Sequence, residues 1–269
     1  MKSLSGKVVV VTGASSGIGH AVAQEALKQG ALVACCARDV QKLTENITLT
    51  PNSFLYQADV TIAEQCKAFI EAVIAKWGRV DVLVCNAGIS MRALFADADL
   101  TVLHRLMDTN FWGMVNCVKY AETSIVAHKG VIVGVSSIAG YRGLPARTGY
   151  SASKFAMQGF LEALRTELLY SGAHVMWVSP GFTASNIRNV ALSGTGNAQT
   201  ESPLDEKKLM SAEQCAKIII EGIVKRKRTV VMTGEGRLTM WLNRVLPSFT
   251  DRQVYKRFYN EPGSPLADK

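Results

Sequence analysis

The sequence predicts an α/β protein with a doubly wound, mainly parallel sheet of seven strands and helices on both faces. Short runs of β-branched residues alternate along the chain with longer helical patterns. The first run leads directly into a glycine-rich turn, and an alanine-rich helical pattern follows that turn. Such alternation is typical of parallel sheets whose strands are joined by right-handed helical crossovers.

The predicted strands are apolar runs of the kind that are buried on both faces of a parallel sheet. They cover residues 7–12, 32–37, 53–57, 80–85, 131–136, 174–179 and 229–232. The clearest helical patterns between them cover residues 17–28, 61–77, 109–126, 149–170 and 211–225. Thr61 and Ser211 each precede Glu or Gln by three residues, which predicts capping boxes at two helix starts.

Length and composition fit one domain over residues 1–269. Hydrophobic residues make up 48% of the chain, which excludes general disorder and supports a large core. The apolar runs are shorter than the about 18–20 residues that a transmembrane helix needs. Residues 1–7 lead straight into the first strand, so no signal peptide is expected.

The six cysteines indicate a reducing, cytoplasmic location and no metal site. Their positions show neither the paired spacing of zinc ligands nor a secreted disulfide framework. We expect them to be small buried hydrophobic residues. Cys35 and Cys36 are neighbours in a predicted strand, so they point to opposite faces and are poorly placed to form a disulfide.

One long stretch interrupts the alternation of strands and helices. Residues 183–210 are rich in Gly, Ser, Thr and Asn and show little periodicity. A loop of this length inside a compact domain is usually a lid or a disordered segment. We expect a lid over a substrate site here.

The turn after the first strand has the composition of a phosphate-binding loop. Its sequence, TGASSGIG at residues 12–19, lies between a predicted buried strand and a helix. Glycines allow a tight turn and close backbone approach, and the helix N-terminus offers N–H groups to a pyrophosphate. A plain surface loop is the alternative. The residues expected to contact phosphate are Gly13, Ser15, Ser16, Gly17, Ile18 and Gly19.

The end of the second strand suggests which dinucleotide would bind. In dinucleotide-binding folds this strand ends with an acid that holds the ribose 2′-hydroxyl. Here Arg38 follows the strand, 19 residues after Gly19. A guanidinium there suits a 2′-phosphate, which favours NADP(H). A solvated arginine at the start of a helix is the alternative.

Tyr150 and Lys154 form a candidate proton-transfer pair. Four residues apart near the start of a predicted helix, their side chains lie on one face. A nearby ammonium favours the phenolate, so we expect Lys154 to lower the pKa of Tyr150 toward neutrality. That is what general acid–base chemistry on a carbonyl/alcohol pair needs. Ser137 ends the preceding strand and would lie at the same edge of the sheet.

In these motifs the chain resembles the short-chain dehydrogenase/reductases. The resemblance runs from about residue 7 to residue 232, with the motifs in the expected order. They are TGASSGIG at 12–19, Asp59-Val60, Asn86-Ala87-Gly88, Asn110, Ser137, Tyr150 with Lys154, and Pro180-Gly181. The resemblance implies a Rossmann-type, dinucleotide-binding catalytic domain. It also implies a homodimer or homotetramer.

The resemblance further implies roles for individual residues. Tyr150 would donate a proton to the carbonyl oxygen, Ser137 would polarise that oxygen, and Lys154 would bind the nicotinamide ribose. Asn110 would hold a water that links Lys154 to solvent. The remaining cofactor contacts would come from Asp59 and Val60 at the adenine, from Asn86, Ala87 and Gly88 at the sheet edge, and from Pro180, Gly181 and Thr183 near the carboxamide.

Several of these residues also have ordinary structural interpretations. Asp59 would serve equally as a helix cap, residues 86–88 as a plain turn, and Asn110 as a polar group inside a helix. After Pro180-Gly181 the family often has Val, one residue and then Thr, whereas this chain has Phe182-Thr183-Ala184-Ser185. Either Thr183 or Ser185 would supply the hydroxyl.

The basic C-terminal segment is set apart by its charge. The chain carries a net charge of +8, and residues 217–259 hold ten basic and three acidic residues. Leu238, Trp241, Leu242 and Val245 recur at helical spacing and form an apolar stripe. Residues 236–269 are therefore expected to be a basic amphipathic extension. It would either pack over the substrate cleft or a partner subunit, or contact a membrane surface; nucleic acid is not expected.

These observations predict an NADP(H)-dependent oxidoreductase that interconverts a ketone and a secondary alcohol. Extended C-termini of this kind resemble those of family members that act on steroid- or lipid-like ketones, which implies a hydrophobic substrate. The alternatives are a non-enzymatic dinucleotide-binding regulator and a membrane-surface protein built on the same fold.

Overall fold

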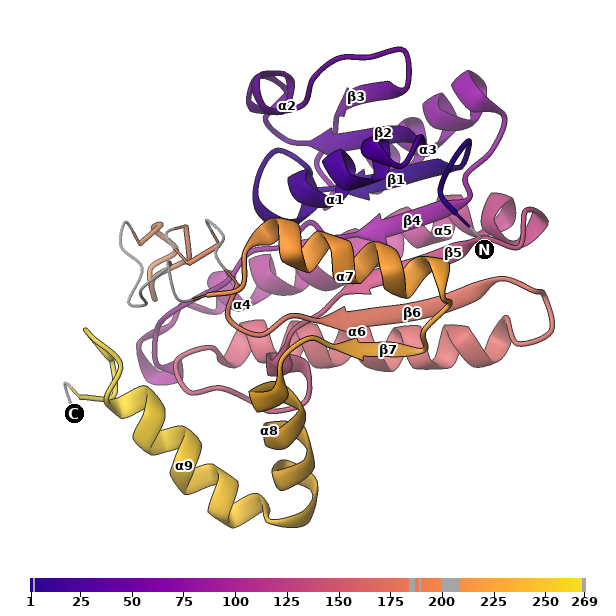
Figure 1. The fold of residues 1–269 in the computed structure, drawn as a ribbon. Helices are drawn as coiled ribbons and strands as arrows, with labels where there is room; N and C mark the ends of the chain where they lie inside the picture. Colours follow the sequence, from indigo (N-terminus) through magenta and orange to yellow (C-terminus); the bar gives the residue numbers. More distant parts are fainter. Residues whose placement is uncertain (2, 184–186, 189, 200–208, 268–269) are drawn as a thin grey trace.

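The centre of the molecule is one twisted parallel sheet (Figure 1). The computed structural model describes residues 1, 3–183, 187–188, 190–199 and 209–267. The strands are β1 (Val8–Thr12), β2 (Leu32–Ala37), β3 (Ser53–Gln57), β4 (Val82–Cys85), β5 (Val131–Val135), β6 (His174–Ser179) and β7 (Thr229–Val231). Their order is β3-β2-β1-β4-β5-β6-β7, and every neighbouring pair is parallel. Within the described ranges, the predicted seven-stranded sheet is confirmed.

Helices connect the strands in the order expected from the sequence. They are α1 (Gly17–Lys28), α2 (Val40–Asn46), α3 (Ala63–Trp77), α4 (Leu100–Met107), α5 (Gly113–Ala127), α6 (Thr148–Glu167), α7 (Ala212–Val224), α8 (Gly234–Val245) and α9 (Pro247–Tyr259). Short helical turns occur at Phe95–Asp97, Asp108–Trp112 and Ile138–Gly140. The sequence patterns did not reveal α2, α4 or α9, because short or polar helices leave little periodicity.

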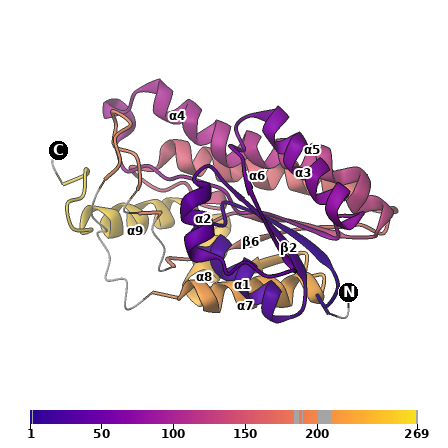
Figure 2. The same ribbon diagram turned by 90° about the horizontal axis from the view of Figure 1, so that it is seen from above.

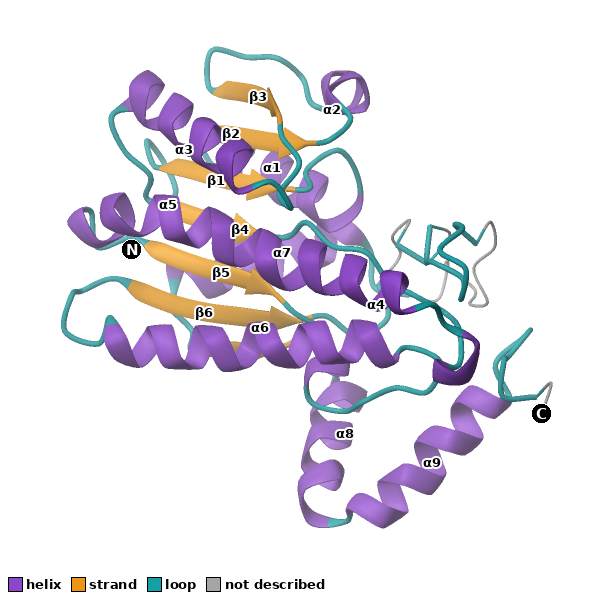
Figure 3. Cartoon of the chain, turned by 180° about the vertical axis from the view of Figure 1, so that it is seen from behind, coloured by secondary structure: helices purple, strands orange, loops and turns teal. Residues whose placement is uncertain are grey.

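The helices form layers on both faces of the sheet (Figures 2 and 3). On one face α1 and α7 cover a core that includes Val9 and Val11. On the other face α3, α5 and α6 cover a core that includes Val8 and Val10. Cys35 and Cys36 are divided between the same two cores, as their neighbouring strand positions predict. All six cysteines are buried, and none forms a disulfide.

The strand order places a crevice at the carboxyl ends of β1 and β4. The chain runs outward from β1 through β2 to β3 and then returns to β4 on the other side of β1. Connections therefore diverge between β1 and β4, and in such sheets ligands bind at this switch point. The segments that leave β1, β4, β5 and β6 all reach this same edge.

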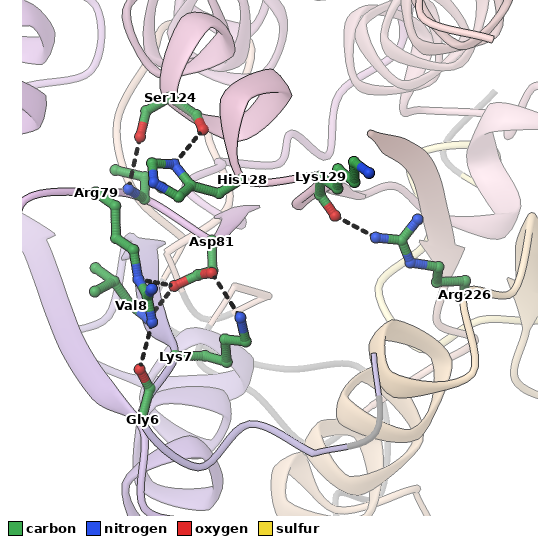
Figure 4. Close-up of polar contacts among 10 residues, drawn as sticks. Gly6, Lys7, Val8, Arg79, Asp81, Ser124, His128, Lys129 and Arg226 are labelled. Atoms are coloured by element: carbon green, nitrogen blue, oxygen red, sulfur yellow. Dashed lines mark hydrogen bonds and ion pairs between the residues drawn. The ribbon is translucent and has the colours of Figure 1, made fainter. Parts of the chain in front are cut away.

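The opposite edge of the sheet is closed by a buried carboxylate (Figure 4). Asp81 is fully buried just before β4, and it accepts hydrogen bonds from the Val8 backbone N–H at 2.9 Å and from Lys7 Nζ at 3.0 Å. Arg79 Nε lies 2.9 Å from Asp81 Oδ2, the same oxygen that accepts from Val8. Nearby, the Arg226 guanidinium donates to the Lys129 carbonyl. The polar groups of Asp81 thus join the starts of β1 and β4 far from the crevice.

Helix ends agree with the sequence at Ser211 and differ at Thr61. Ser211 and Gln214 form the predicted capping box of α7. At α3 no capping box forms, because Asp59 Oδ1 accepts hydrogen bonds from both the N–H and the hydroxyl of Thr61, and Ile62 becomes the N-cap. The predicted helix at 109–126 is α5 together with the π-helical turn Asp108–Trp112 before it.

The chain after β7 forms two helices, α8 and α9, that meet in a V beside the sheet (Figures 1 and 3). The predicted stripe on α8 is largely exposed: Leu238, Trp241 and Val245 are 55%, 58% and 53% accessible. None of the helices in the described ranges combines the length and apolar character that a membrane span requires. Of the predicted lid, residues 184–186, 189 and 200–208 lie outside the described residues.

Candidate active site

The turn after β1 packs against the end of β4 with no space for extra atoms. Gly13 has φ +64°, and a Cβ there would lie 2.7 Å from Ala87 Cα. A Cβ on Gly19 would collide with Asn86 Nδ2 and with the Gly13 carbonyl. Asn86 Nδ2 donates to the carbonyls of Thr12 and Gly13, each at 3.0 Å. Glycines are therefore required at both positions, and residues 86–88 support the turn.

A cavity of about 370 Å³ opens beside this turn. Its walls include the predicted residues Gly13, Ser15, Ser16, Gly17, Ile18, Arg38, Asp59, Val60, Asn86, Ala87 and Gly88. Gly19 does not line it and lies behind the turn. Ser16 is the N-cap of α1 but accepts no side-chain capping bond, and the first turn carries no acidic residue. The N-terminus of α1 is thus suited to a phosphate.

Two cations lie at the end of β2, where the sequence indicated one. Arg38 and Lys42 both line the large cavity. Asp39 lines it as well, but its carboxylate accepts from the Lys42 N–H at 2.9 Å and caps α2. The sequence did not predict Lys42, because α2 was not expected; a cation four residues after Arg38 was the available signal.

Asp59 and Val60, the residues expected at the adenine, also line this cavity. The Asp59 carboxylate is engaged with Thr61, and its N–H donates to Gln65 Oε1 at 2.7 Å. Cavity lining and structural capping therefore occur together at this residue. The two interpretations of Asp59 from the sequence do not exclude each other.

A second cavity, of about 130 Å³, contains the predicted proton-transfer group. Ser137, Tyr150 and Lys154 line it together with Pro180, Gly181 and Thr183. It shares Ile18, Asn86 and Gly88 with the larger cavity, so the two cavities adjoin each other. Thr183 is buried, and Ser185 lies outside the described residues.

The pKa of Tyr150 differs from the value expected from the sequence. Burial raises it, while the Ser137 hydroxyl and the guanidinium groups of Arg147 and Arg188 lower it to a smaller extent. Lys154 Nζ lies 5.7 Å from the centre of the phenol ring and donates to the Val135 carbonyl at 2.9 Å. Burial lowers the pKa of Lys154 to about 8. Burial therefore acts on both groups: it raises the pKa of Tyr150 and makes the Lys154 ammonium, which was expected to lower that pKa, less favourable.

Asn110 lies behind the second cavity and does not line it. Its amide donates to the Ile89 carbonyl at 3.0 Å and to Ser153 Oγ at 2.9 Å, and its Oδ1 accepts from the Ile89 N–H. Ser153 Oγ in turn donates to the Tyr150 carbonyl at 2.7 Å. Asn110 belongs to the π-helical turn between α4 and α5, a feature often found at functional sites.

A third cavity, of about 310 Å³, joins the catalytic group to the C-terminal helices. It shares Ser137, Leu144 and Phe182 with the second cavity. The C-terminal helices contribute Gly236, Thr239, Val254 and Phe258 together with the ion-paired Glu235 and Arg257. One face of the segment therefore covers the cleft, which is one of the two arrangements expected from the sequence.

Polar contacts attach the C-terminal helices to the loop between Ser137 and Tyr150. Arg142 donates to Asn243 Oδ1 on α8 at 2.9 Å and to Asp251 Oδ1 on α9 at 2.5 Å. Asn243 Nδ2 donates to the Tyr141 carbonyl at 3.1 Å. The C-terminal helices are thus attached to the loop that connects Ser137 with the start of α6.

Sequence reasoning missed two arginines beside the phenol. Arg147 and Arg188 both line the second cavity. Arg147 precedes Tyr150 by three residues, the spacing that places two side chains on one side of a helix. That spacing was a usable signal. Arg188 falls in the predicted lid, where no pattern singled it out.

Comparison with known proteins agrees with this arrangement. Residues 7–195 match the family model described as short chain dehydrogenase. An 11-beta-hydroxysteroid dehydrogenase-like protein from Arabidopsis thaliana is 33% identical over 252 residues, which cover 91% of this chain and 83% of the relative. A short-chain dehydrogenase structure from Streptomyces avermitilis is 27% identical and superimposes with a TM-score of 0.80, covering 94% of this chain and 98% of that one.

A further solved structure shares the fold at lower identity. It is a short chain dehydrogenase from Burkholderia cenocepacia in complex with NADP, 22% identical, with a TM-score of 0.80 and coverage of 94% and 98% of the two chains. The family model spans most of the chain, and the hydroxysteroid dehydrogenase-like relative spans nearly all of it. The chain is therefore a member of the short-chain dehydrogenase family of oxidoreductases.

Proposed function

We propose that this oxidoreductase uses NADP(H) to interconvert a ketone and a secondary alcohol on a hydrophobic substrate. The observation that carries the proposal is the position of Tyr150 and Ser137 between two larger cavities. One is the cavity beside the glycine turn, and the other is covered by the C-terminal helices. A carbonyl in the middle cavity would meet the phenol on one side and a cofactor on the other.

The residues present fit a dinucleotide with a 2′-phosphate. The glycine turn and the N-terminus of α1 suit the pyrophosphate, because Gly13 and Gly17 line the cavity and the N-cap residue Ser16 makes no side-chain capping bond. Arg38 and Lys42 supply two cations where the adenosine ribose would lie. Gly88, Pro180, Gly181 and Thr183 line the continuation toward Tyr150, where the nicotinamide would lie.

The protein's own residues then transfer one proton to or from the substrate oxygen. Tyr150 gives its phenolic proton to the carbonyl oxygen as the ketone becomes an alcohol, and takes it back in the reverse direction. Ser137 donates a hydrogen bond to the same oxygen and stabilises the charge that develops there. When bound, the nicotinamide supplies or accepts the hydride at the carbonyl carbon. Lys154 would bind the nicotinamide ribose. Asn110 fixes the backbone of Ile89 and the hydroxyl of Ser153, and it would hold a water that connects Lys154 with solvent.

The third cavity points to a hydrophobic substrate. Ile138, Leu144, Phe182, Met210, Val254 and Phe258 give it a mostly apolar wall. Such a wall favours a bulky hydrocarbon body over a small polar ketone, because apolar surface gains free energy when it leaves water. A steroid-like or lipid-like ketone satisfies both this wall and the polar groups at Ser137 and Tyr150.

The test is the initial rate of NADPH oxidation with small, long-chain and steroidal ketones, with NADH in parallel. Tyr150→Phe should lower turnover by about 10²–10⁴-fold, since a positioned general acid contributes that much, while NADPH binding is retained. Equal rates in wild type and variant would remove Tyr150 from the mechanism. Tight NADPH binding without turnover of any ketone would favour the non-enzymatic regulator.

We also propose that the protein contacts an anionic membrane surface from a cytoplasmic location. Five exposed apolar residues around the α8–α9 turn form what we call the outer face: Leu238, Trp241, Val245, Leu246 and Phe249. Arg237, Arg244, Arg252 and Lys256 lie in the same segment and join no ion pair among the described residues. The two acids of α8 and α9 are both paired, Glu235 with Arg257 and Asp251 with Arg142.

This arrangement is complementary to anionic lipid, because exposed cations surround an apolar surface. The test is sedimentation with vesicles of phosphatidylserine and phosphatidylcholine. Trp241→Ser should reduce binding, and high salt should release the protein. Tyr170→Ser is the matched control, because Tyr170 is 97% exposed but follows α6, away from the outer face. Equal loss in both variants would contradict the proposal.

A homodimer or homotetramer is proposed as well. Among the apolar side chains of α6 and its C-cap residue, Leu161, Leu164 and Leu168 are buried in the core and unavailable to a second subunit. Phe155 is 46% exposed, and Phe160 borders a cavity between α5 and α6. Sedimentation equilibrium of wild type and Phe155→Ser would show whether this face joins two copies.

A further inference from the structure

Arg147 is a buried cation next to the catalytic phenol. It is 7% exposed, occupies the N-cap position of α6, and lines the same cavity as Tyr150. Its guanidinium lies over the Phe258 ring, 4.8 Å from the ring centre. The preceding residue, Ala146, has φ +57°, and its carbonyl accepts a hydrogen bond from the Ala93 N–H at 3.0 Å. A non-glycine residue in this region is strained, so the surrounding contacts hold the loop in place.

The partner of Arg147 comes from the end of the described chain. Glu261 lies in the C-terminal tail, residues 260–267, and its carboxylate accepts from Arg147 Nη2 at 3.1 Å. Arg92 also approaches this carboxylate, at 3.9 Å, and donates to the Pro262 carbonyl at 2.5 Å. The side chains of Arg147 and Glu261 are each 8% exposed. In such a place water screens charge poorly, and the effect of one charge on another is strong.

We propose that Arg147 is a positioning residue for proton transfer at Tyr150, and that Glu261 sets how much positive charge Arg147 presents to the phenol. This inference rests on the proposed role of Tyr150 as proton donor. It makes the C-terminal tail part of the catalytic apparatus, although the tail touches none of the reacting atoms.

The other charged groups around Tyr150 are cations, which sets the contribution of Glu261 apart from theirs. Lys154 faces the phenol from α6 itself, and Arg188 lies across the cavity on the segment after β6. No carboxylate is found among the described residues that line this cavity. Behind Arg147 lie Arg92 and Glu261, and the Glu261 carboxylate pairs with both arginines.

The sign of the effect follows from the charges. Arg147 lowers the pKa of Tyr150, because a cation favours the phenolate. Removing the Glu261 charge leaves Arg147 uncompensated, so the Tyr150 pKa should fall. Removing the Arg147 charge should raise it. Because the effects of the two charges add, removing both should give a Tyr150 pKa between those of the two single variants.

The experiment follows the ionisation of Tyr150 directly in the NADP⁺-bound protein. Tyrosine labelled with ¹³C at the ζ carbon reports phenolate formation by NMR, and Tyr150→Phe assigns the signal. Glu261→Gln should lower the Tyr150 pKa by on the order of one pKa unit, and Arg147→Met should raise it by a similar amount. Arg147→Lys keeps the cation and should restore most of the wild-type value.

Two comparisons exclude a general loosening of the pocket. Asp251→Asn breaks the other ionic contact between the C-terminal helices and the catalytic loop, but Asp251 pairs with Arg142 and does not line the Tyr150 cavity. It should leave the Tyr150 signal unchanged. The double variant Arg147→Met/Glu261→Gln should give a Tyr150 pKa below that of Arg147→Met and above that of Glu261→Gln. This double variant also lacks an unpaired buried charge, so it should fold even if Glu261→Gln is destabilised.

The proposal is overturned if the Tyr150 signal is unchanged in Glu261→Gln across the accessible pH range. It is equally overturned if Asp251→Asn gives the same shift, or if the Tyr150 pKa of the double variant lies outside the range set by the two single variants. The reaction itself is tested separately, by turnover in wild type against Tyr150→Phe. Absence of turnover with the expected NMR shifts would therefore reject the proposed function and leave the electrostatic link in place.

Discussion

The cofactor side of the molecule and the C-terminal helices are held together by different kinds of contact. Around the glycine turn, the backbone is closely packed: a Cβ on Gly13 would collide with the Ala87 backbone, and a Cβ on Gly19 would collide with the Gly13 carbonyl and the Asn86 amide. The C-terminal helices are instead held by long charged side chains, and their outer face remains exposed. The first region depends on the absence of side chains, and the second depends on their presence.

This difference teaches where changes in sequence can be tolerated. Close backbone packing has a steep energy cost, since an added methyl group must displace main-chain atoms. Exposed ion pairs contribute little individually, and only a buried pair is costly to break. We therefore expect that a single added methyl group disrupts the glycine turn. In the C-terminal helices we expect substitutions to be costly mainly at Glu261.

The largest effect on stability is expected at Lys154, the buried base between the two regions. Its pKa falls from the ordinary 10.5 to about 8, so between these values the unfolded chain binds more protons than the folded one. Stability should therefore rise as pH increases through this window. Below pH 8 the buried ammonium is destabilising.

Lys154→Met should abolish this rise and should be more stable than wild type at pH 7. We expect a gain of about 1–3 kcal/mol, after allowing for the lost hydrogen bond to Val135. Urea unfolding at pH 7 and above pH 10.5 measures it, and the two proteins should converge at the higher pH. Parallel pH curves for wild type and variant would show that Lys154 titrates normally.

The next largest effect is expected at Gly19, which tests the backbone packing of the turn. Gly19→Ala should weaken NADPH binding by about 10–100-fold, or about 1.4–2.8 kcal/mol, because the turn must move away from Asn86. Fluorescence titration with NADPH measures the change. Gly159→Ala is the matched control: nothing lies within 4 Å of a Cβ there, so this variant should bind normally and gain slight helix stability. Equal affinity in the two variants would refute the packing argument.

A smaller effect is expected at Arg38, which tests the charge at the end of β2. Arg38→Ala should reduce the preference for NADPH over NADH by about tenfold, or about 1.4 kcal/mol, because Lys42 retains part of the positive field. The measurement is kcat/KM with each cofactor. Lys42→Ala should give a weaker change in the same direction. An unchanged ratio in both variants would show that neither cation meets the 2′-phosphate.

The smallest effect is expected at Asp251, which tests the exposed ionic contact of α9. The Asp251 side chain is 61% exposed, so solvent screens its pair with Arg142. Asp251→Asn should lower the free energy of unfolding by less than about 1 kcal/mol. Thermal unfolding measures it, and a loss several times larger would mean that Arg142 organises the C-terminal helices more strongly than the exposure of this pair indicates.

The sheet and the cofactor side were predictable because their signals are local. β-branched runs, glycine spacing and the Tyr150–Lys154 interval each lie within a few consecutive residues. The short helix α2 was missed, and with it Lys42, because seven residues carry too little periodicity. The capping box at Thr61 was wrong because Asp59, two residues earlier, competes for the same hydroxyl.

The charge environment of Tyr150 was not predictable, since it depends on burial and on distant partners. The sequence placed Lys154 near the phenol but gave no measure of how strongly both groups are buried. Burial reverses the expected direction of the Tyr150 pKa. The pairing of Arg147 with Glu261 spans 114 residues, and no local pattern connects the two.

The distance along the chain between Arg147 and Glu261 also bears on how the protein is made. At about 5–20 residues per second, the ribosome adds Glu261 roughly 6–23 seconds after Arg147. Tyr150 and strands β6 and β7 are synthesised within that interval, and throughout it the guanidinium of Arg147 has no Glu261 carboxylate to pair with. The ion pair between Arg147 and Glu261 is therefore a contact that the nascent chain makes only after all seven strands have been synthesised.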